Sequence, residues 1–259
     1  MAELNGAPVE RAQLQALALT NYGHFTTMRV ENGGVRGLSR HLDRLRADSR
    51  ALFDAELDTD RVRAYARRSL AGASPAIVRI TVFDPELQLG HPGAEARPNV
   101  LVTTRAAADA APPPLQLRSV RYGRDLPEIK HVGLFGALKH RRAAQRAGFD
   151  DALFTDADGR ISEIATSNIG FVDGDQVVWP SGEQLPGVTQ RLVAELAAPT
   201  TRTAPVTVAE AARMEAVFAT NAAVGLRPVR TVDGHGWPER HPVLERLQRD
   251  YAAIEPEPL

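Results

Sequence analysis

The sequence predicts a two-domain α+β protein of mixed α/β character. The chain has 259 residues, enough for one large domain or two small ones. Strand and helix patterns mix in the first part, whereas short strand patterns with regularly spaced turns dominate the second. Between them lies "AAADAAPPP" (106–114), where three prolines after small residues are typical of a semi-rigid linker. We therefore expect an N-terminal α/β domain over 1–108, a linker over 109–118 and a C-terminal domain over 119–259.

The N-terminal domain is expected to combine strands and helices. "HFTTMRVENG" (24–33) is rich in β-forming residues and ends at a glycine turn. Periodicity and β-branched runs predict the other elements, which are helices over 39–53 and 59–70 and strands over 76–82 and 99–104. Ser39 and Thr59 are the candidate helix caps.

The C-terminal domain is expected to be richer in strands. Its predicted strands, separated by turn signals such as "DADG" and "DGD", cover 115–123, 152–156, 160–172, 176–180 and 216–221. Its predicted helices cover 133–147, 188–197 and 241–254. Thr207 and Glu210 match a capping box, which indicates one further helix start.

Composition excludes several function classes. There is no cysteine, so disulfides and thiol chemistry are absent. The net charge is −1 with mixed signs along the chain, so we expect no nucleic-acid or membrane partner. Histidine never occurs at metal-ligand spacing, and no metal is expected. The opening "MAELNGAPVERAQ" lacks the apolar core of a signal peptide, so the expected location is cytoplasmic. The glycine-rich, serine-elbow and zinc motifs of common enzyme classes are also missing.

Lysine is rare in this chain. Only two of the 31 lysine and arginine residues are lysine, and both lie in "DLPEIKHVGLFGALKHRR" (125–142). An amine can form a Schiff base with an aldehyde, which a guanidinium cannot do. Lys139 belongs to "KHRR", typical of a solvated helix face, whereas Lys130 precedes a small, apolar stretch. Lys130 is therefore the candidate reactive amine, with a plain surface lysine as the alternative.

Two further patterns fit the same chemistry. Glu163 lies in a predicted strand between isoleucines, and a carboxylate that keeps a pyridine nitrogen protonated accompanies the lysine in pyridoxal phosphate (PLP) sites. The alternative for Glu163 is the solvent face of the strand. "LPGVTQRL" places a glycine before a helix start, where N–H groups, the helix dipole and the Thr189 hydroxyl favour a phosphate. An ordinary capped helix is the alternative there.

The order of these motifs resembles a known family. The series "HLDRL … IKH … DDALFTDADGRISEIATSNIGFV … WP … LPGVTQ … FATNAAVGLRPVRTVD", from about residue 22 to 233, is similar to the class IV aminotransferases. These fold-type IV PLP enzymes include branched-chain and D-amino acid aminotransferases and 4-amino-4-deoxychorismate lyase. The resemblance implies a smaller N-terminal α/β domain and a larger strand-rich C-terminal domain that hold PLP between them, in a homodimer.

The resemblance also implies roles for individual residues. Lys130 matches the Schiff-base lysine that moves the proton during catalysis, and Glu163 matches the partner of the pyridine nitrogen. The implied phosphate ligands are Arg44, Val188, Thr189 and Asn221, with Ala222 on the same turn near the phosphate or the substrate carboxylate.

The substrate site departs from its relatives. Branched-chain enzymes have a tyrosine five residues after the lysine, where this chain has Phe135. The loop "FDPELQLGHPG" contains His91 but lacks the arginine of D-amino acid enzymes, and "VFD" (82–84) lacks that of the lyases. Arg79, His91 and Arg121 are the remaining candidates for holding a substrate carboxylate.

The predicted function is that of a PLP-dependent transferase. An amino group would pass from an amino acid or amine to a 2-keto acid through a Schiff base on Lys130. One alternative is a 4-amino-4-deoxychorismate lyase that releases pyruvate. A second alternative is a non-catalytic relative that acts as a binding protein.

Overall fold

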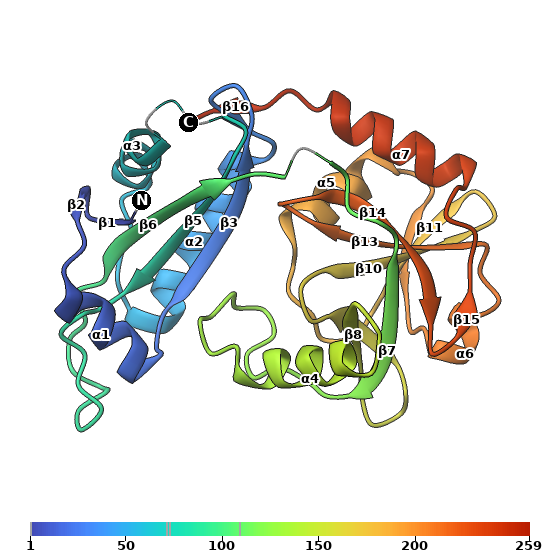
Figure 1. Ribbon diagram of the computed structural model, residues 1–259, viewed down its shortest axis with the longest axis horizontal. Helices are drawn as coiled ribbons and strands as arrows, with labels where there is room; N and C mark the ends of the chain where they lie inside the picture. Colours follow the sequence, from blue (N-terminus) through green and yellow to red (C-terminus); the bar gives the residue numbers. More distant parts are fainter. Residues whose placement is uncertain (1, 71, 73, 109) are drawn as a thin grey trace. The chain divides into compact units, whose positions relative to one another are not determined.

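The computed structural model describes residues 2–70, 72, 74–108 and 110–259, which form two compact units (Figure 1). Unit 1 consists of described residues of Met1–Asp109 with Ile129–Gly133 and Glu255–Leu259, and unit 2 of Ala110–Glu128 with Leu134–Ile254. The sequence-based boundaries assign 129–133 and 255–259 to the C-terminal part instead. The mixed α/β class expected from the sequence is confirmed.

Unit 1 is built on a five-stranded antiparallel sheet with the order β2-β1-β6-β5-β3. Its strands are β1 (Ala2–Leu4), β2 (Ala7–Pro8), β3 (His24–Val30), β5 (Ala76–Phe83) and β6 (Asn99–Ala106). Its helices are α1 (Arg11–Thr20), α2 (Leu38–Phe53) and α3 (Thr59–Leu70). A separate pair joins β4 (Gly34–Val35) to β16 (Glu257–Pro258).

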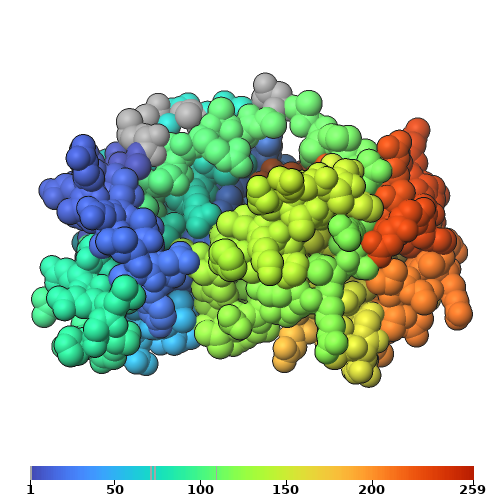
Figure 2. Space-filling view, turned by 60° about the horizontal axis from the view of Figure 1, so that its bottom comes forward, coloured from blue at the N-terminus to red at the C-terminus, as the bar shows by residue number. Residues whose placement is uncertain are grey.

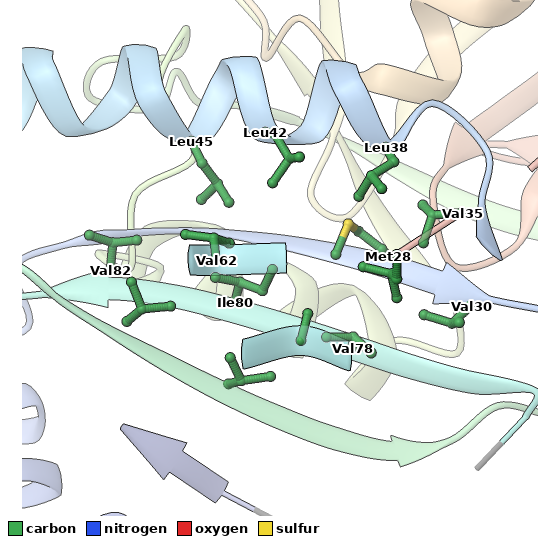
Figure 3. Packing of buried hydrophobic residues seen from close by; sticks show 14 of the residues in the cluster. Met28, Val30, Val35, Leu38, Leu42, Leu45, Val62, Val78, Ile80 and Val82 are labelled. Atoms are coloured by element: carbon green, nitrogen blue, oxygen red, sulfur yellow. The ribbon is translucent and has the colours of Figure 1, made fainter. Parts of the chain in front are cut away.

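Helix α2 packs on one face of this sheet through a leucine stripe (Figure 3). Leu38, Leu42 and Leu45 are buried and point toward Met28 of β3. Their spacing of four and three residues places them on one side of a helix. Val62 of α3 joins the same cluster, so both helices cover this face. This packing fixes α2 against β3, and it thereby positions the polar residues that both elements contribute to the candidate site.

The predicted helices are confirmed, but their caps differ from the expectation. Gly37, in the left-handed conformation, precedes α2, and Ser39 instead donates its N–H and hydroxyl to the carboxylate of Glu257. The Asp58 carboxylate accepts from the N–H groups of residues 60 and 61 at the start of α3. Thr59 therefore lies inside α3, because an aspartate one residue earlier supplies the acceptor.

Unit 2 contains a curled nine-stranded mixed sheet with the order β12-β11-β10-β13-β14-β7-β8-β9, and β15 pairs with β14. Its strands are β7 (Leu115–Arg121), β8 (Asp151–Thr155), β9 (Ile161–Ile164), β10 (Asn168–Asp173), β11 (Gln176–Pro180), β12 (Thr201–Ala204), β13 (Ala216–Asn221), β14 (Gly225–Val232) and β15 (His235–Gly236). Its helices are α4 (Phe135–Arg146), α5 (Val188–Leu196), α6 (Val208–Ala211) and α7 (Pro242–Ala253). Within the described part of the chain, no helix is both long and apolar enough to cross a membrane.

Several local predictions for unit 2 can be compared with the structure. The capping box of Thr207 and Glu210 is present at the start of α6. The single strand expected over 160–172 is divided into β9 and β10, because Ile164 and Ser167 pair across a tight turn. Strand β7 begins at Leu115, as the predicted strand over 115–123 does, and therefore overlaps the span 109–118 that was expected to be a linker.

Candidate functional site

Lys130 is held by its backbone against the edge strand of unit 1. Its carbonyl accepts from the Phe25 N–H at 2.9 Å, and its own N–H donates to the Asp48 carboxylate of α2 at 3.3 Å. Two residues further, the Val132 N–H donates to the Gly23 carbonyl at 2.9 Å. The segment 129–133 thus continues the sheet beyond β3. Lys130 is thus held beside the edge of the sheet next to an isolated bridge between His131 and His24.

The side chain of Lys130 meets a second cation at one aromatic ring. Lys130 Nζ lies 4.9 Å from the ring centroid of Phe25, and Arg79 Cζ lies 3.6 Å from the same centroid. Phe25 alternates along β3 with residues that face α2, so this ring lies on the opposite face of the sheet. Arg79 also donates to the Thr81 hydroxyl at 3.3 Å, and burial lowers the pKa of its guanidinium.

Arg44 lies on the α2 side of the same strand. Arg44 Nη2 donates to the Thr26 hydroxyl at 2.9 Å, and that hydroxyl lies 2.7 Å from His41 Nδ1. Burial, followed by the charge of Arg44, lowers the pKa of His24 from 6.5 to about 3. Burial, followed by the charges of Arg44 and Lys130, holds the pKa of His41 well below its usual value. Both imidazoles are therefore neutral beside a guanidinium.

In unit 2, Glu163 is buried rather than on a solvent face. It is 6% exposed within β9, and its two carboxylate oxygens have separate donors. Arg124 Nε donates to Oε1 at 2.6 Å and the Leu185 N–H donates to Oε2 at 3.2 Å. Arg124 also donates to the carbonyl of Pro127. The carboxylate is therefore fixed from both sides.

The start of α5 offers uncapped donors in unit 2. Val188 and Thr189 are buried at this helix start, where no side-chain cap bonds the first N–H groups. The Thr189 hydroxyl is buried and has no hydrogen-bond partner among the described residues. A Cβ on Gly187 would stand 2.0 Å from Asn168 Oδ1, so only glycine fits this turn. Donors that converge at a helix start favour an anion.

Asn221 uses its side chain to shape the turn after β13. Asn221 Oδ1 accepts from the N–H groups of Ala223 and Val224, each at 3.0 Å, and Nδ2 donates to the Ser167 hydroxyl at 2.9 Å. Ala222 is half-buried on the same turn. The amide of Asn221 is thus engaged within the protein, and the turn presents its backbone.

The other candidates lie in exposed positions. His91 belongs to the exposed loop after β5, Arg121 ends β7 in an exposed position, and Phe135 begins α4 with 79% of its side chain exposed. Among the described residues, no group of three or more histidine or acidic side chains could hold a metal ion.

Sequence reasoning assigned no role to Arg124 or His41. Arg124 is one of many arginines, and its partner Glu163 lies 39 residues away in the chain. His41 stands in the quoted motif "HLDRL" three residues before Arg44, which was the only signal available. Within unit 1, Lys130 and Arg79 contact the same aromatic ring, and Arg44 and His41 contact the same hydroxyl. Within unit 2, Arg124 forms an ion pair with Glu163.

Comparisons with known proteins identify relatives of this chain and of its fold. Branched-chain-amino-acid aminotransferase 6 of Arabidopsis thaliana is 42% identical over 105 residues, which cover 38% of this chain and 30% of that protein. The chain matches less than half the length of each curated relative found. The Escherichia coli branched-chain amino acid aminotransferase shares the fold, with a TM-score of 0.86 and 21% identity, over 100% of this chain and 95% of that one.

A second solved structure comes from another branch. The 4-amino-4-deoxychorismate lyase of Pseudomonas aeruginosa has a TM-score of 0.81 and 25% identity, over 96% of this chain and 97% of that one. The family model for amino-transferase class IV matches residues 23–232, which include every proposed ligand from Arg44 to Ala222. With this match spanning both units, the chain belongs to the class IV aminotransferases, a family of PLP-dependent proteins.

Proposed function

We propose that this chain is a PLP-dependent aminotransferase that exchanges an amino group between an amino acid, or an amine, and a 2-keto acid. The observation that supports this most is Lys130. It is one of only two lysines, its backbone is held on both sides, and it lies within the matched family region. A lysine amine is the group that captures an aldehyde.

The residues present fit the cofactor. In unit 2, a buried Thr189 hydroxyl without a partner in the described chain and an uncapped helix start both fit a phosphate. The turn before them needs Gly187, because a Cβ there would stand 2.0 Å from Asn168 Oδ1. The buried carboxylate of Glu163 fits a protonated ring nitrogen. In unit 1, Arg44 supplies a guanidinium for the phosphate.

Each residue then has a role of its own. When bound, PLP supplies an aldehyde that captures amines and a ring that accepts the electron pair of a broken bond to the substrate Cα. Lys130 Nζ would be the nucleophile toward the aldehyde and the base that accepts the proton from the substrate Cα and passes it to the former aldehyde carbon. Glu163 would hold the ring nitrogen, and Arg44, the first N–H groups of α5 and Thr189 would be the ligands of the phosphate.

Arg79 is the proposed partner of the substrate carboxylate. Of the three candidates, it alone lies beside the ring that Lys130 contacts. His91 and Arg121 are both exposed. A guanidinium held over an aromatic ring keeps its donors in a fixed plane, which favours a carboxylate.

A spectroscopic experiment tests the proposal. Purified protein with added PLP should show a visible absorbance band that is lost in Lys130→Ala. A panel of D- and L-amino acids and amines, which includes leucine, isoleucine and valine because several relatives bear branched-chain names, should then bleach the band. A colourless protein that takes up no PLP would reject this function.

The lyase is the second candidate. Its supporting observation is the similarity to the P. aeruginosa lyase over 96% of this chain. Release of pyruvate from 4-amino-4-deoxychorismate without any amino acceptor would favour the lyase. Transfer that requires a 2-keto acid acceptor would favour the aminotransferase.

We also propose a homodimer, as the family resemblance implies. Phe135 and Leu138 are 79% and 54% exposed, and their spacing places them on one side of α4. They line a shallow, open hollow on the surface of this helix. Figure 2 views the molecule from the side on which α4 lies. Light scattering should give twice the monomer mass, and Leu138→Glu should reduce the measured mass.

A cytoplasmic location stays a prediction that cell fractionation would test.

A further inference from the structure

The orientation of His41 follows from its hydrogen bond to Thr26. Arg44 can only donate, so the Thr26 hydroxyl accepts from Arg44 Nη2 at 2.9 Å. Within the described chain, that hydroxyl has no acceptor for its own hydrogen other than His41 Nδ1, at 2.7 Å. The hydroxyl therefore donates to Nδ1. His41 is neutral, and its single hydrogen is on Nε2.

This arrangement leaves His41 Nε2–H as a buried donor. His41 is 1% exposed, and Nε2 has no hydrogen-bond partner among the described residues. Such a donor costs about 1–3 kcal/mol when it stays unpaired, so buried donors nearly always have an acceptor. An acceptor from outside the chain would remove this cost.

The charges around His41 favour an anionic acceptor. The charges of both Arg44 and Lys130 act on its ring. Arg44 follows His41 by three residues on α2, so the two side chains leave the helix on one side. Asp48, further along the same face, accepts from the Lys130 backbone N–H at 3.3 Å. A neutral donor adds a directed hydrogen bond without a further positive charge near the lysine amine, which must be neutral to react.

We propose that His41 Nε2–H donates to the phosphate group of PLP beside Arg44, and that Thr26 is the positioning residue that fixes the required tautomer. This inference rests on the proposed function, because it assumes that PLP is the ligand. The group that His41 would bind is a phosphate monoester dianion. A buried water on Nε2 is the alternative that the experiment must separate.

Binding of PLP and of pyridoxal to the apoprotein tests the inference. Pyridoxal has the same aldehyde and ring but lacks the phosphate. His41→Leu should raise the Kd of PLP about ten-fold or more, the effect of one hydrogen bond to a charged group, and leave the Kd of pyridoxal unchanged. His41→Gln, which retains an amide N–H near the position of Nε2, should recover most of the PLP affinity.

A second variant covers the case in which His41 substitutions prevent folding. Thr26→Val keeps the shape of the side chain but removes the hydroxyl, and it should weaken PLP several-fold with no effect on pyridoxal. Equal losses for both ligands, or no loss for PLP, would overturn the inference, because they indicate a structural role or a water partner. A wild-type protein that binds neither ligand would instead reject the proposed function.

Discussion

The buried pair of Arg124 and Glu163 gives the sharpest prediction. Arg124→Met removes the guanidinium that donates to Glu163 Oε1 at 2.6 Å and to the Pro127 carbonyl, while the chain keeps an apolar side chain of similar length. The carboxylate of Glu163 would then have only the Leu185 N–H at 3.2 Å. A charge buried beside one weak donor should destabilise unit 2.

The expected size of this effect follows from burial. The side chains of Arg124 and Glu163 are 10% and 8% exposed, so solvent screens their interaction little. Removal of one member of such a pair costs about 3–5 kcal/mol, because the other charge stays buried without its partner. For a domain of this size each kcal/mol lowers Tm by about 2–4 °C, which gives a fall of about 6–20 °C.

Calorimetry of the apoprotein measures this fall without any contribution from cofactor. Arg118→Met, on an exposed position of β7, is the matched control and should change the free energy of unfolding by less than about 0.5 kcal/mol. Combining Arg124→Met with Glu163→Gln should recover part of the loss, since no unpaired charge is left. A single Arg124→Met variant within about 1 kcal/mol of wild type would refute this reasoning.

Three further predictions concern other parts of the molecule. Lys130→Arg should abolish the visible absorbance and turnover, because a guanidinium cannot add to an aldehyde, whereas Lys139→Arg should keep both. Gly187→Ala should raise the Kd of PLP about ten-fold or more, since its Cβ would stand 2.0 Å from a neighbouring oxygen, whereas Gly90→Ala meets open space and should be silent. The pKa of His24 falls from 6.5 to about 3 on folding, so unfolding takes up a proton between these values and stability decreases as the pH falls from 6.5 toward 3. His24→Phe should reduce that decrease by about 1.4 kcal/mol per pH unit in thermal unfolding.

Each of these has a contrary outcome. Absorbance retained by Lys130→Arg would assign the reactive amine to another group. An unchanged PLP Kd in Gly187→Ala would mean that the phosphate does not bind at the start of α5. An unchanged pH profile in His24→Phe would mean that the imidazole takes up its proton in the folded state.

Periodicity predicted the elements whose burial is set by local pattern. The leucine stripe of α2 buries one side of a helix, and the β-branched run of β5 is buried along nearly its whole length, so both were expected within a residue or two. The sequence contained no comparable signal for α1, whose ten residues include none that is fully buried. Segments 129–133 and 255–259 belong to unit 1 only through pairing with distant strands, which no local pattern records.

Chemistry made some candidate site residues visible in the sequence and hid others. Lys130 was noticeable because lysine is rare in this chain, and Glu163 because a carboxylate stood among isoleucines. Arg124 was hidden by the abundance of arginine. The part played by His41 depends on its contact with Thr26, 15 residues away in the chain, and on the direction of a single hydroxyl hydrogen. The direction of that hydrogen follows only from Arg44, which donates to the same hydroxyl oxygen.

The anchoring of Lys130 divides the proposed roles between the two units. Its carbonyl and N–H are both bonded to residues of unit 1, and Asp48, which holds the N–H, lies 82 residues away in the chain. The position of the amine therefore depends on β3 and α2, whereas the position of Glu163 depends on Arg124 and Leu185 in unit 2. Substitutions at the β3 edge should then alter the reactivity of the amine and leave the stability of the Arg124–Glu163 pair unchanged. Substitution of Arg124 should instead lower the stability of unit 2, because its guanidinium donates to Glu163 within that unit.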